Sequence, residues 1–349
     1  MYISDFYLHE LDHALDMVPE NLRLAEKAIL VTGATGLIGS YIVDLLLALN
    51  RKHNSNIKVY ALGRNINRLK KRFDEWNDSN LLFLEHDVNE PLKCQTHFDY
   101  IIHAASYAYP AAFDKYPVDT IISNTMGTLN LLEHARRQNT KRFVFVSSGE
   151  VYGQADRPDL IFEEDYCGYV NPLDARSCYP NSKRLGETLC VAYLKQYQVS
   201  SVIVRPCHVY GPYTTRRDNR ASTQFIDCVL RNEPVVLQSL GLQRRSYCYV
   251  ADCATAILTA MLEGKDGAAY NIANPESIAT IAELAGLIAE KAGQKVIMPQ
   301  PSDLPPNMPV RNQVLCSKSI EALGWKGQYT LERGVRHTLH IRKESMKYE

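Results

Sequence analysis

Two short segments in the middle of the chain carry the side chains best suited to proton transfer. Residues 147–153 read Ser-Ser-Gly-Glu-Val-Tyr-Gly, and residues 177–183 read Ser-Cys-Tyr-Pro-Asn-Ser-Lys. Tyr179 and Lys183 are four residues apart, so on a helix they would share one face. Because an ammonium group beside a phenol favours the phenolate, we expect Lys183 to lower the pKa of Tyr179 toward neutrality. Ser148 would then hydrogen-bond a reacting carbonyl.

A glycine-rich turn near the start of the chain is the second candidate site. Residues 31–39 read Val-Thr-Gly-Ala-Thr-Gly-Leu-Ile-Gly, after a predicted strand and at the start of a predicted helix. Glycines let backbone N–H groups approach a diphosphate, and the helix N-terminus adds partial positive charge. We interpret the turn as a dinucleotide-binding site formed by Gly33, Thr35, Gly36, Leu37, Ile38 and Gly39. The alternative is a purely structural glycine turn.

The end of the second predicted strand bears on which dinucleotide binds. Folds that select NAD place an acidic residue there, whereas this chain has Gly63 followed by Arg64. A guanidinium can hold a 2′-phosphate, so the sequence favours NADP over NAD, with a solvated loop arginine as the alternative. Asp87 and Val88, after the third predicted strand, are candidate adenine contacts, although a plain turn aspartate would fit as well.

The elements that must position these residues alternate along the chain. Six short β-rich runs are predicted as buried strands, at 28–32, 57–62, 81–85, 100–104, 142–147 and 201–205. Helical periodicity separates them, most clearly over 37–49, 115–138 and 179–197. This alternation predicts an α/β fold with a doubly wound parallel sheet, Rossmann-like. We expect an N-terminal helical extension (1–26), a dinucleotide-binding domain (27–205) and a mainly substrate-binding, mixed α/β lobe (206–349) with segments returning to the first domain.

Composition restricts the class of partner. The 349 residues carry 39 Lys and Arg against 39 Asp and Glu, so bulk electrostatics gives no reason to expect a nucleic-acid or membrane partner. The nine cysteines are scattered and lack a Cys-x-x-Cys pair, which argues against a disulfide framework or a metal site. With no apolar signal segment at the N-terminus, the chain is expected to be cytoplasmic.

Taken together, these motifs resemble the extended short-chain dehydrogenase/reductases, in the NAD-dependent epimerase/dehydratase family that acts on nucleotide sugars. Besides the glycine turn and the Ser148, Tyr179 and Lys183 set, the matching features include His103-Ala104-Ala105, Asn124, Arg205-Pro206-x-x-Val209-Tyr210-Gly211-Pro212 and Arg244-Arg245-Ser246-Tyr247. The resemblance implies that Ala104 contacts the cofactor, as Tyr179 and Lys183 also would. It implies that Asn124 supports proton relay, and that Arg245 and Arg220 bind the substrate nucleotide. The family is also typically homodimeric, which would pair the helices at 115–138 and 179–197.

The local sequence is most similar to UDP-glucuronate decarboxylases, with three departures from family patterns. Gly63 replaces the usual acidic cofactor residue. His208 stands where asparagine is common, which puts its expected substrate contact in doubt. Gly149 replaces the aspartate of the Asp–Glu pair that 4,6-dehydratases use, and this disfavours dehydration. Glu150 is counted among the candidate catalytic and substrate-binding residues, and for a reductase it would be a substrate-positioning or a vestigial residue.

The Gly63-Arg64 pair leads us to expect a net reductase. The predicted reaction is NADPH-dependent reduction of a nucleotide-linked 4-keto-6-deoxysugar, dTDP-4-keto-6-deoxyglucose by analogy, for surface polysaccharide such as lipopolysaccharide. Tyr179 would give the proton, Lys183 would hold the ribose, and Ser148 would orient the oxygen. Two alternatives remain open. One is a redox-neutral decarboxylase or 4-epimerase with bound NAD, and the other is a non-catalytic NADP-binding scaffold.

Overall fold

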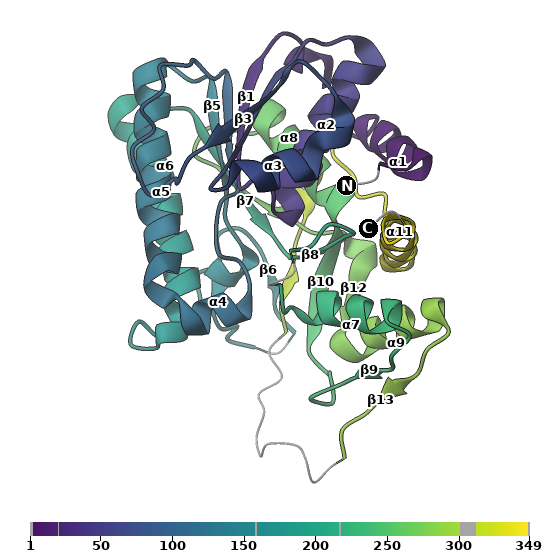
Figure 1. Ribbon diagram of the computed structural model, residues 1–349. Helices are drawn as coiled ribbons and strands as arrows, with labels where there is room; N and C mark the ends of the chain where they lie inside the picture. The colour runs from purple at the N-terminus through teal and green to yellow at the C-terminus, as the bar shows by residue number, and fades with distance from the viewer. Residues whose placement is uncertain (1–2, 20, 158, 216–217, 301–311, 348–349) are drawn as a thin grey trace.

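The computed structural model describes residues 1–349 except 1–2, 20, 158, 216–217, 301–311 and 348–349 (Figure 1). Within these residues the main sheet has seven parallel strands in the order β11-β7-β5-β4-β1-β2-β3. Its strands are β1 (Ala28–Thr32), β2 (Lys58–Gly63), β3 (Leu81–Glu85), β4 (Tyr100–His103), β5 (Arg142–Val146), β7 (Ser201–Pro206) and β11 (Ala269–Ile272). The predicted Rossmann-like α/β fold is confirmed.

Helices cover both faces of this sheet, as a parallel sheet requires. The helices of the described residues, including those of the C-terminal lobe, are α1 (Asp5–Leu15), α2 (Leu37–His53), α3 (Ile66–Phe73), α4 (Pro110–Lys115), α5 (Pro117–Gln138), α6 (Cys178–Tyr197), α7 (Ala221–Leu230), α8 (Val250–Glu263), α9 (Ile281–Ala292), α10 (Lys318–Glu321) and α11 (Leu331–Ser345). Helices α5 and α6 pack together on one face, whereas α2 and α8 pack on the other (Figure 1). The predicted helix over 115–138 is divided, because α4 ends at Lys115 and α5 begins at Pro117.

The strand residues divide alternately between two hydrophobic cores, because successive side chains point to opposite faces of a sheet. Ile29 and Val31 of β1 join the core beneath α2 and α8, whereas Leu30 joins the core beneath α5 and α6. Each of these side chains is fully buried. The near-continuous apolar runs in the sequence therefore reflect strands buried on both faces.

The chain after residue 206 builds several smaller elements and one strand of the main sheet. Strands β8 (His208–Tyr210), β10 (Arg244–Tyr249) and β12 (Ile278–Thr280) form a three-stranded sheet, and β9 (Val235–Val236) pairs with β13 (Val296–Ile297). A further pair joins β6 (Ile161–Phe162) to β14 (Val314–Leu315). The sequence did not predict β11, which nevertheless pairs in parallel with β7 at the edge of the main sheet.

Helix α1 belongs to the core of the molecule. Tyr7 and Leu11 are fully buried where α1 packs on α2 and α8. The carboxylate of Glu10, also buried, accepts hydrogen bonds from the hydroxyls of Tyr41 and Tyr249 and lies against His337 of α11. Helix α1 thereby connects the sheet domain to the C-terminal helix, and the domain boundaries drawn from the sequence stay a prediction.

Candidate functional site

Two adjoining cavities lie along the carboxyl ends of the main strands, where ligands bind in open α/β sheets. The cofactor cavity, of about 450 Å³, is lined by residues that follow β1, β2, β3 and β4. The substrate cavity, of about 280 Å³, is lined by residues that follow β5 and β7. Ala104 and Ser106 line both cavities, so a molecule bound in one would meet a molecule bound in the other at this point.

Most of the predicted cofactor residues line the cofactor cavity. These are Gly33, Thr35, Gly36, Arg64, Asp87, Val88 and Ala104. Ile38 instead lines the substrate cavity, and Leu37 is packed in the core. Gly39 lies in the first turn of α2, so its predicted contact would come from its backbone N–H. Tyr179 and Lys183, predicted as catalytic residues that also contact the cofactor, line the substrate cavity.

The glycine turn is packed so closely that side chains do not fit. Gly33 has a φ of +66°, and a Cβ there would lie 2.8 Å from the carbonyl oxygen of Ala104. A Cβ at Gly39 would lie 2.4 Å from the carbonyl oxygen of Gly33. Gly36 begins α2 without a side-chain cap, which leaves N–H groups of the first helical turn to be satisfied by another partner. The turn therefore offers an uncapped helix N-terminus to an anion.

Arg64 occupies the cofactor cavity, held by a residue from the loop after β4. Its Nη1 donates a hydrogen bond to the Tyr107 hydroxyl at 2.8 Å, and its guanidinium lies 5.1 Å from the centroid of that ring. Arg68 of α3 also lines the cavity, and Gly63 leaves the end of β2 without a carboxylate. Sequence reasoning did not identify Arg68 or Tyr107, although Arg68 lies four residues after Arg64.

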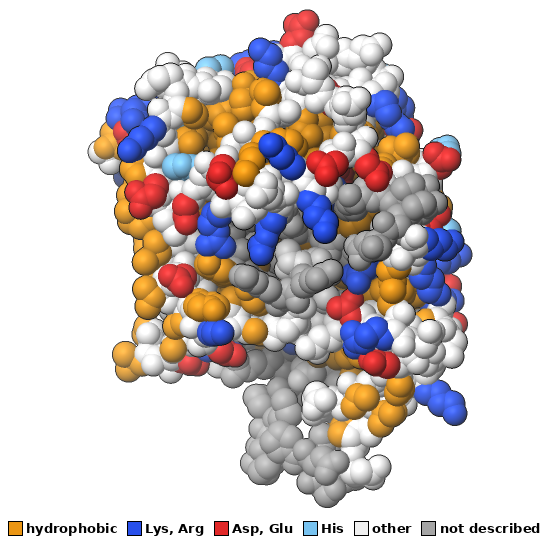
Figure 2. Space-filling view, viewed as in Figure 1, with side chains coloured by type: hydrophobic (Ala, Val, Ile, Leu, Met, Phe, Trp, Pro, Cys, Tyr) orange, Lys and Arg blue, Asp and Glu red, His pale blue; other side chains and the backbone are white. Residues whose placement is uncertain are grey.

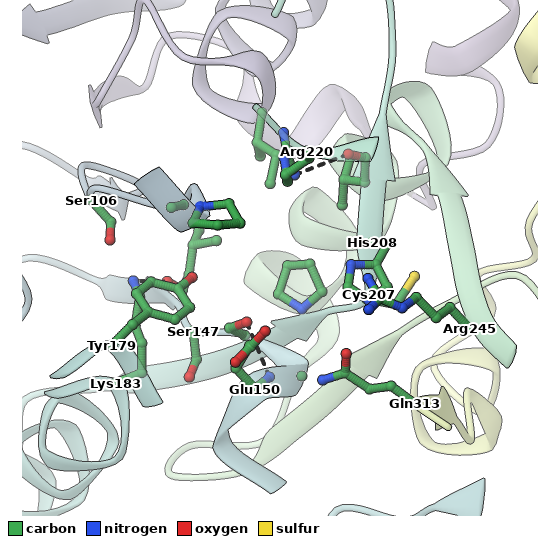
Figure 3. Close-up of a pocket in the computed structure, with 18 of the residues that line it drawn as sticks. Ser106, Ser147, Glu150, Tyr179, Lys183, Cys207, His208, Arg220, Arg245 and Gln313 are labelled. Carbon is green, nitrogen blue, oxygen red and sulfur yellow. Dashed lines mark hydrogen bonds between the residues drawn. The ribbon is translucent and has the colours of Figure 1, made fainter. Parts of the chain in front are cut away.

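The three predicted catalytic side chains meet in the substrate cavity (Figure 3). Tyr179 and Lys183 lie in the first turns of α6, and Ser148 follows β5. The Ser148 oxygen accepts a hydrogen bond from the backbone N–H of Glu150 at 3.2 Å, and the Tyr179 and Ser148 hydroxyls are hydrogen-bonded. Helix α6 and the turn after β5 thus bring together residues about thirty positions apart.

Burial changes both titratable groups of the Tyr179–Lys183 pair. It raises the pKa of Tyr179 to about 12, although the hydrogen bond with Ser148 opposes this. It lowers the pKa of Lys183 to about 7. Lys183 Nζ donates a hydrogen bond to the Val146 carbonyl at 2.7 Å and lies 5.8 Å from the centroid of the Tyr179 ring. The expected lowering of the Tyr179 pKa is therefore wrong for this structure, because desolvation outweighs any effect of the lysine.

Glu150 faces a cation that sequence reasoning did not count among the site residues. Arg176 Nη2 lies 3.4 Å from Glu150 Oε2 within the substrate cavity. The Arg176 guanidinium also lies over the Phe113 ring, 4.5 Å from its centroid, and Phe113 stacks on Tyr179 with ring centroids 4.5 Å apart. The position of Arg176, one helical turn before Tyr179, was a signal available in the sequence. No local pattern identified Phe113.

Three of the predicted substrate-binding residues, His208, Arg220 and Arg245, lie across the cavity from Tyr179 (Figure 3). Arg245 Nε and His208 Nε2 are buried without a hydrogen-bond partner among the described residues. Burial, followed by the charges of Arg245 and Arg220, holds the pKa of His208 well below its usual value. Arg220, by contrast, donates from Nε to the Asp218 carboxylate at 2.9 Å and from Nη1 to the Val209 carbonyl at 3.2 Å. Arg245 therefore has unmet hydrogen-bonding capacity at this end of the cavity.

Asn124 acts on the position of Tyr179 through one intermediate residue. Its Nδ2 donates to the Ser182 hydroxyl at 2.9 Å, and that hydroxyl donates to the Tyr179 carbonyl at 3.0 Å. Its Oδ1 is buried without a partner among the described residues. The contact joins α5 to the start of α6, and the proton-relay role implied by resemblance stays a prediction.

Two further features bear on the chemistry available. In the part of the chain that the structure describes, no three His, Cys, Asp or Glu side chains are grouped as a metal site would need. Over the same residues, no helix is both long and apolar enough to cross a membrane. Among the described residues that line the substrate cavity, Glu150 supplies the carboxylate, and Arg176, Lys183, Arg220 and Arg245 supply the cationic side chains.

Comparisons with known proteins agree with this geometry. The model of the NAD dependent epimerase/dehydratase family matches residues 29–273. UDP-glucuronic acid decarboxylase 3 of Arabidopsis thaliana is 34% identical over 310 residues, covering 88% of this chain and 86% of that protein. UDP-glucuronic acid decarboxylase 1 of Xenopus tropicalis is 31% identical over 327 residues, covering 93% and 74% respectively.

Solved structures show the same fold. The Bordetella bronchiseptica enzyme WbmF, in complex with NAD+ and UDP, has a TM-score of 0.76 and 25% identity, over 94% of this chain and 95% of that one. UDP-glucose 4-epimerase of Thermotoga maritima, with UDP-glucose, has a TM-score of 0.75 and 24% identity, over 91% and 99% respectively. The predicted family resemblance is confirmed: the chain belongs to the NAD dependent epimerase/dehydratase family, as an enzyme of the kind that modifies nucleotide sugars.

Proposed function

We propose that this enzyme decarboxylates UDP-glucuronate in a redox-neutral reaction with bound NAD. The observation that carries the proposal is a substrate cavity in which a hydroxyl pair, Tyr179 and Ser148, adjoins the Glu150–Arg176 ion pair. The similarity to UDP-glucuronic acid decarboxylases, which extends over 88% of the chain, supports the same reaction. In a uronic acid, the carboxylate is attached to the carbon next to C4, which bears a hydroxyl. The carboxylate could bind the Arg176 cation while the C4 hydroxyl meets the hydroxyls of Tyr179 and Ser148.

The residues of the cofactor cavity fit a dinucleotide. The uncapped first turn of α2 suits a diphosphate, and Asp87 and Val88, which line the same cavity, would border the adenine. NAD bound there would oxidise C4 of the sugar to a ketone and later reduce it, which leaves no net redox change. Its reactive ring would belong near Ala104 and Ser106, where the two cavities join.

The side chains of this protein would move the protons. To accept the proton of the C4 hydroxyl, Tyr179 must be ionised, so the reaction requires that the bound ligands lower its pKa from the raised value of about 12; Tyr179 returns the proton at the end, while Ser148 hydrogen-bonds the same oxygen. When the carbon–carbon bond to the carboxylate breaks, CO2 leaves and the electron pair moves onto the C4 oxygen. The two hydroxyls stabilise that developing charge by donating hydrogen bonds. A proton supplied by water then joins C5 in place of the lost carboxylate, and a UDP-pentose remains. Glu150 is placed to orient the sugar, and Arg245 to bind the diphosphate.

Two other reactions receive less support. At Gly149, a Cβ would lie 3.1 Å from Leu315 Cδ1, so the aspartate used by 4,6-dehydratases would fit there only if Leu315 moved. The relatives named above are decarboxylases and an epimerase. Their names therefore favour the alternative given in the sequence analysis, a redox-neutral decarboxylase or 4-epimerase with bound NAD. They do not support the expected 4-keto-6-deoxysugar reductase for surface polysaccharide. A 4-epimerase remains the second candidate, because it would use the same hydroxyls and NAD.

The reaction is tested with UDP-glucuronate labelled in the carboxyl carbon. We expect the protein with NAD to release labelled CO2 and a UDP-pentose, with no steady change in NADH absorbance. A 4-epimerase would leave the label in a UDP-hexuronate. If the protein instead oxidises NADPH steadily with a 4-keto-6-deoxysugar nucleotide and releases no CO2 from UDP-glucuronate, the result would support the reductase reaction.

We also propose that the cofactor cavity accepts the 2′-phosphate of NADP as well as binding NAD. Arg64 and Arg68 line the cavity where the end of β2 has no carboxylate. Arg64→Gln is expected to weaken NADP binding by about tenfold, since charge-assisted contacts to phosphate are lost, and to change NAD affinity less than about twofold. Calorimetry measures both. Lys70→Gln, on the exposed side of α3, is the control. Equal losses for the two dinucleotides would show that Arg64 only anchors the Tyr107 loop.

A homodimer through α5 and α6 is the proposed assembly. Seven hydrophobic side chains on these helices are 37–64% exposed, namely Val118, Ile121, Ile122, Met126, Leu185, Val191 and Tyr197. Figure 1 shows α5 and α6 at the left edge of the molecule, and Figure 2 shows hydrophobic side chains along that edge in the same view. A second copy packed on the same two helices would form a four-helix interface and remove this apolar surface from water.

The dimer gives a specific prediction. Met126→Lys is expected to weaken the dimer by at least about tenfold, because it places a charge in an apolar interface. Light scattering coupled to gel filtration measures the mass over a range of concentrations. Leu242→Lys, which changes a 54% exposed leucine of the C-terminal lobe, is expected to leave the mass unchanged. A wild-type protein that stays monomeric at high concentration would contradict the proposal.

A further inference from the structure

Arg176 belongs to a stack of three side chains that ends on the catalytic phenol. Its guanidinium lies over Phe113, and Phe113 stacks on Tyr179 with an interplanar angle of 22°. Arg176 and Glu150 both line the substrate cavity, and each side chain is about one-third exposed, at 39% and 34%. The guanidinium is thus held in the same cavity as the Tyr179 and Ser148 hydroxyls, and part of it remains accessible.

The other cations of the substrate cavity are engaged elsewhere. Lys183 donates to the Val146 carbonyl, and Arg220 is held by the Asp218 carboxylate. Arg245 lies at the opposite end, beside His208, where we place the diphosphate. These contacts leave Arg176 as the cation best placed to meet an anionic group next to the carbon that reacts at Tyr179.

The existing partner of Arg176 leaves most of its donors free. A guanidinium has five N–H donors, and among the described residues that of Arg176 donates one side-chain hydrogen bond, from Nη2 to Glu150 Oε2 at 3.4 Å. Charge-assisted hydrogen bonds between a guanidinium and a carboxylate are usually near 2.8 Å, so this one is long. A second carboxylate can therefore bind Arg176 without first breaking a strong ion pair.

We propose that Arg176 binds the carboxylate of the uronic acid and so selects UDP-glucuronate over neutral UDP-hexoses. The inference rests on the proposed function, since it names the residue that recognises the group to be lost. The carboxylate is carried by the carbon next to C4, and C4 is the carbon that reacts at Tyr179 and Ser148. Phe113 fixes the plane of the guanidinium, and Glu150 offsets part of its charge.

This role belongs to substrate binding more than to the breaking of the bond. The attraction between Arg176 and the carboxylate is present in the ground state and fades as neutral CO2 forms. An interaction of this kind lowers KM and contributes little to kcat. A neighbouring carboxylate such as Glu150 moderates the attraction, which keeps the ground state from being held too tightly.

Variants at Arg176 test the assignment when binding and turnover are measured separately. For the NAD-loaded protein, calorimetry gives the affinities for UDP-glucuronate and UDP-glucose, and CO2 release gives kcat and KM. Arg176→Gln is expected to weaken UDP-glucuronate binding about 10- to 50-fold and UDP-glucose binding less than about twofold, with kcat within about threefold. Arg176→Lys should restore part of the discrimination. As a matched control, Arg245→Gln should weaken both ligands in parallel.

The outcomes separate this inference from the proposed function. Equal weakening of both ligands by Arg176→Gln, or no weakening of either, would overturn the assignment even if the wild type releases CO2. The wild type could prefer UDP-glucuronate over UDP-glucose, lose this preference in Arg176→Gln, and yet release no CO2. That result would support carboxylate recognition by Arg176 and refute decarboxylation. A wild type that binds UDP-glucuronate no better than UDP-glucose would overturn the assignment of Arg176 directly.

Discussion

Tyr179→Phe lowers kcat by about a thousandfold and leaves NAD affinity unchanged, if the phenol is the proton acceptor and donor at C4. The substitution removes one buried oxygen whose hydrogen-bond partner, Ser148, keeps its contact with the N–H of Glu150. The ring remains stacked on Phe113, so the loss of folding free energy should be about 1 kcal/mol. Turnover is measured by CO2 release, and NAD affinity by calorimetry.

The same helix supplies a control for this variant. Tyr197, at the end of α6, is 45% exposed and lies outside both cavities, so Tyr197→Phe should keep full activity. If Tyr179→Phe were as active as the wild type, the proton-transfer role would be wrong. The non-catalytic scaffold would then regain support, because a protein that only binds a dinucleotide has no use for the phenol.

Gly33→Ala is expected to reduce NAD affinity by at least about a hundredfold. The new Cβ would lie 2.8 Å from three backbone atoms of Ala104 and Ala105, and the φ of +66° disfavours a side chain. Backbone atoms cannot rotate away as a flexible side chain can, so the turn itself must shift. The same strain should lower the free energy of unfolding by about 2 kcal/mol or more. Calorimetry and thermal unfolding measure the two effects.

A second glycine shows whether the effect is local. Gly286 lies within α9, and a Cβ there would meet nothing within 4 Å. Gly286→Ala is therefore expected to leave NAD affinity unchanged and to stabilise the protein by up to about 1 kcal/mol, because alanine favours the helix. A folded Gly33→Ala protein that binds NAD as tightly as the wild type would refute the assignment of the cofactor cavity.

Much of the sheet domain was predictable because its signals are local. The predicted strands over 28–32 and 81–85 coincide with β1 and β3. Those over 100–104, 142–147 and 201–205 differ from β4, β5 and β7 by one residue at one end, and the one over 57–62 is shifted by one residue from β2. Strands buried on both faces read as short apolar runs, and glycine at a strand–helix junction indicates a close backbone approach. The seventh strand, β11, was missed because its four residues pair only with β7, which lies about sixty positions earlier.

The candidate site was predictable only in part, for the same reason. Tyr179 and Lys183 could be placed on one face by their spacing within α6, and their nearness to Ser148 followed from resemblance. Phe113 could not be found, because it reaches Tyr179 from a helix that has no spacing relation to α6. Arg176 is three residues before Tyr179 in the sequence, but its role could not be inferred from that position. The role depends on the contact with the Glu150 carboxylate, which forms only in the folded chain.

The sequence by itself determined the family, the parallel sheet and the glycine turn, and it placed Tyr179 and Lys183 on one helix face as the candidates for proton transfer, since each of these follows from short-range order along the chain. Only the tertiary structure decided the charge state of those residues and the surroundings of the substrate. Desolvation raises the pKa of Tyr179 to about 12 and lowers that of Lys183 to about 7. It arises from the packing of segments that are distant in sequence, and spacing along one helix carries no measure of it.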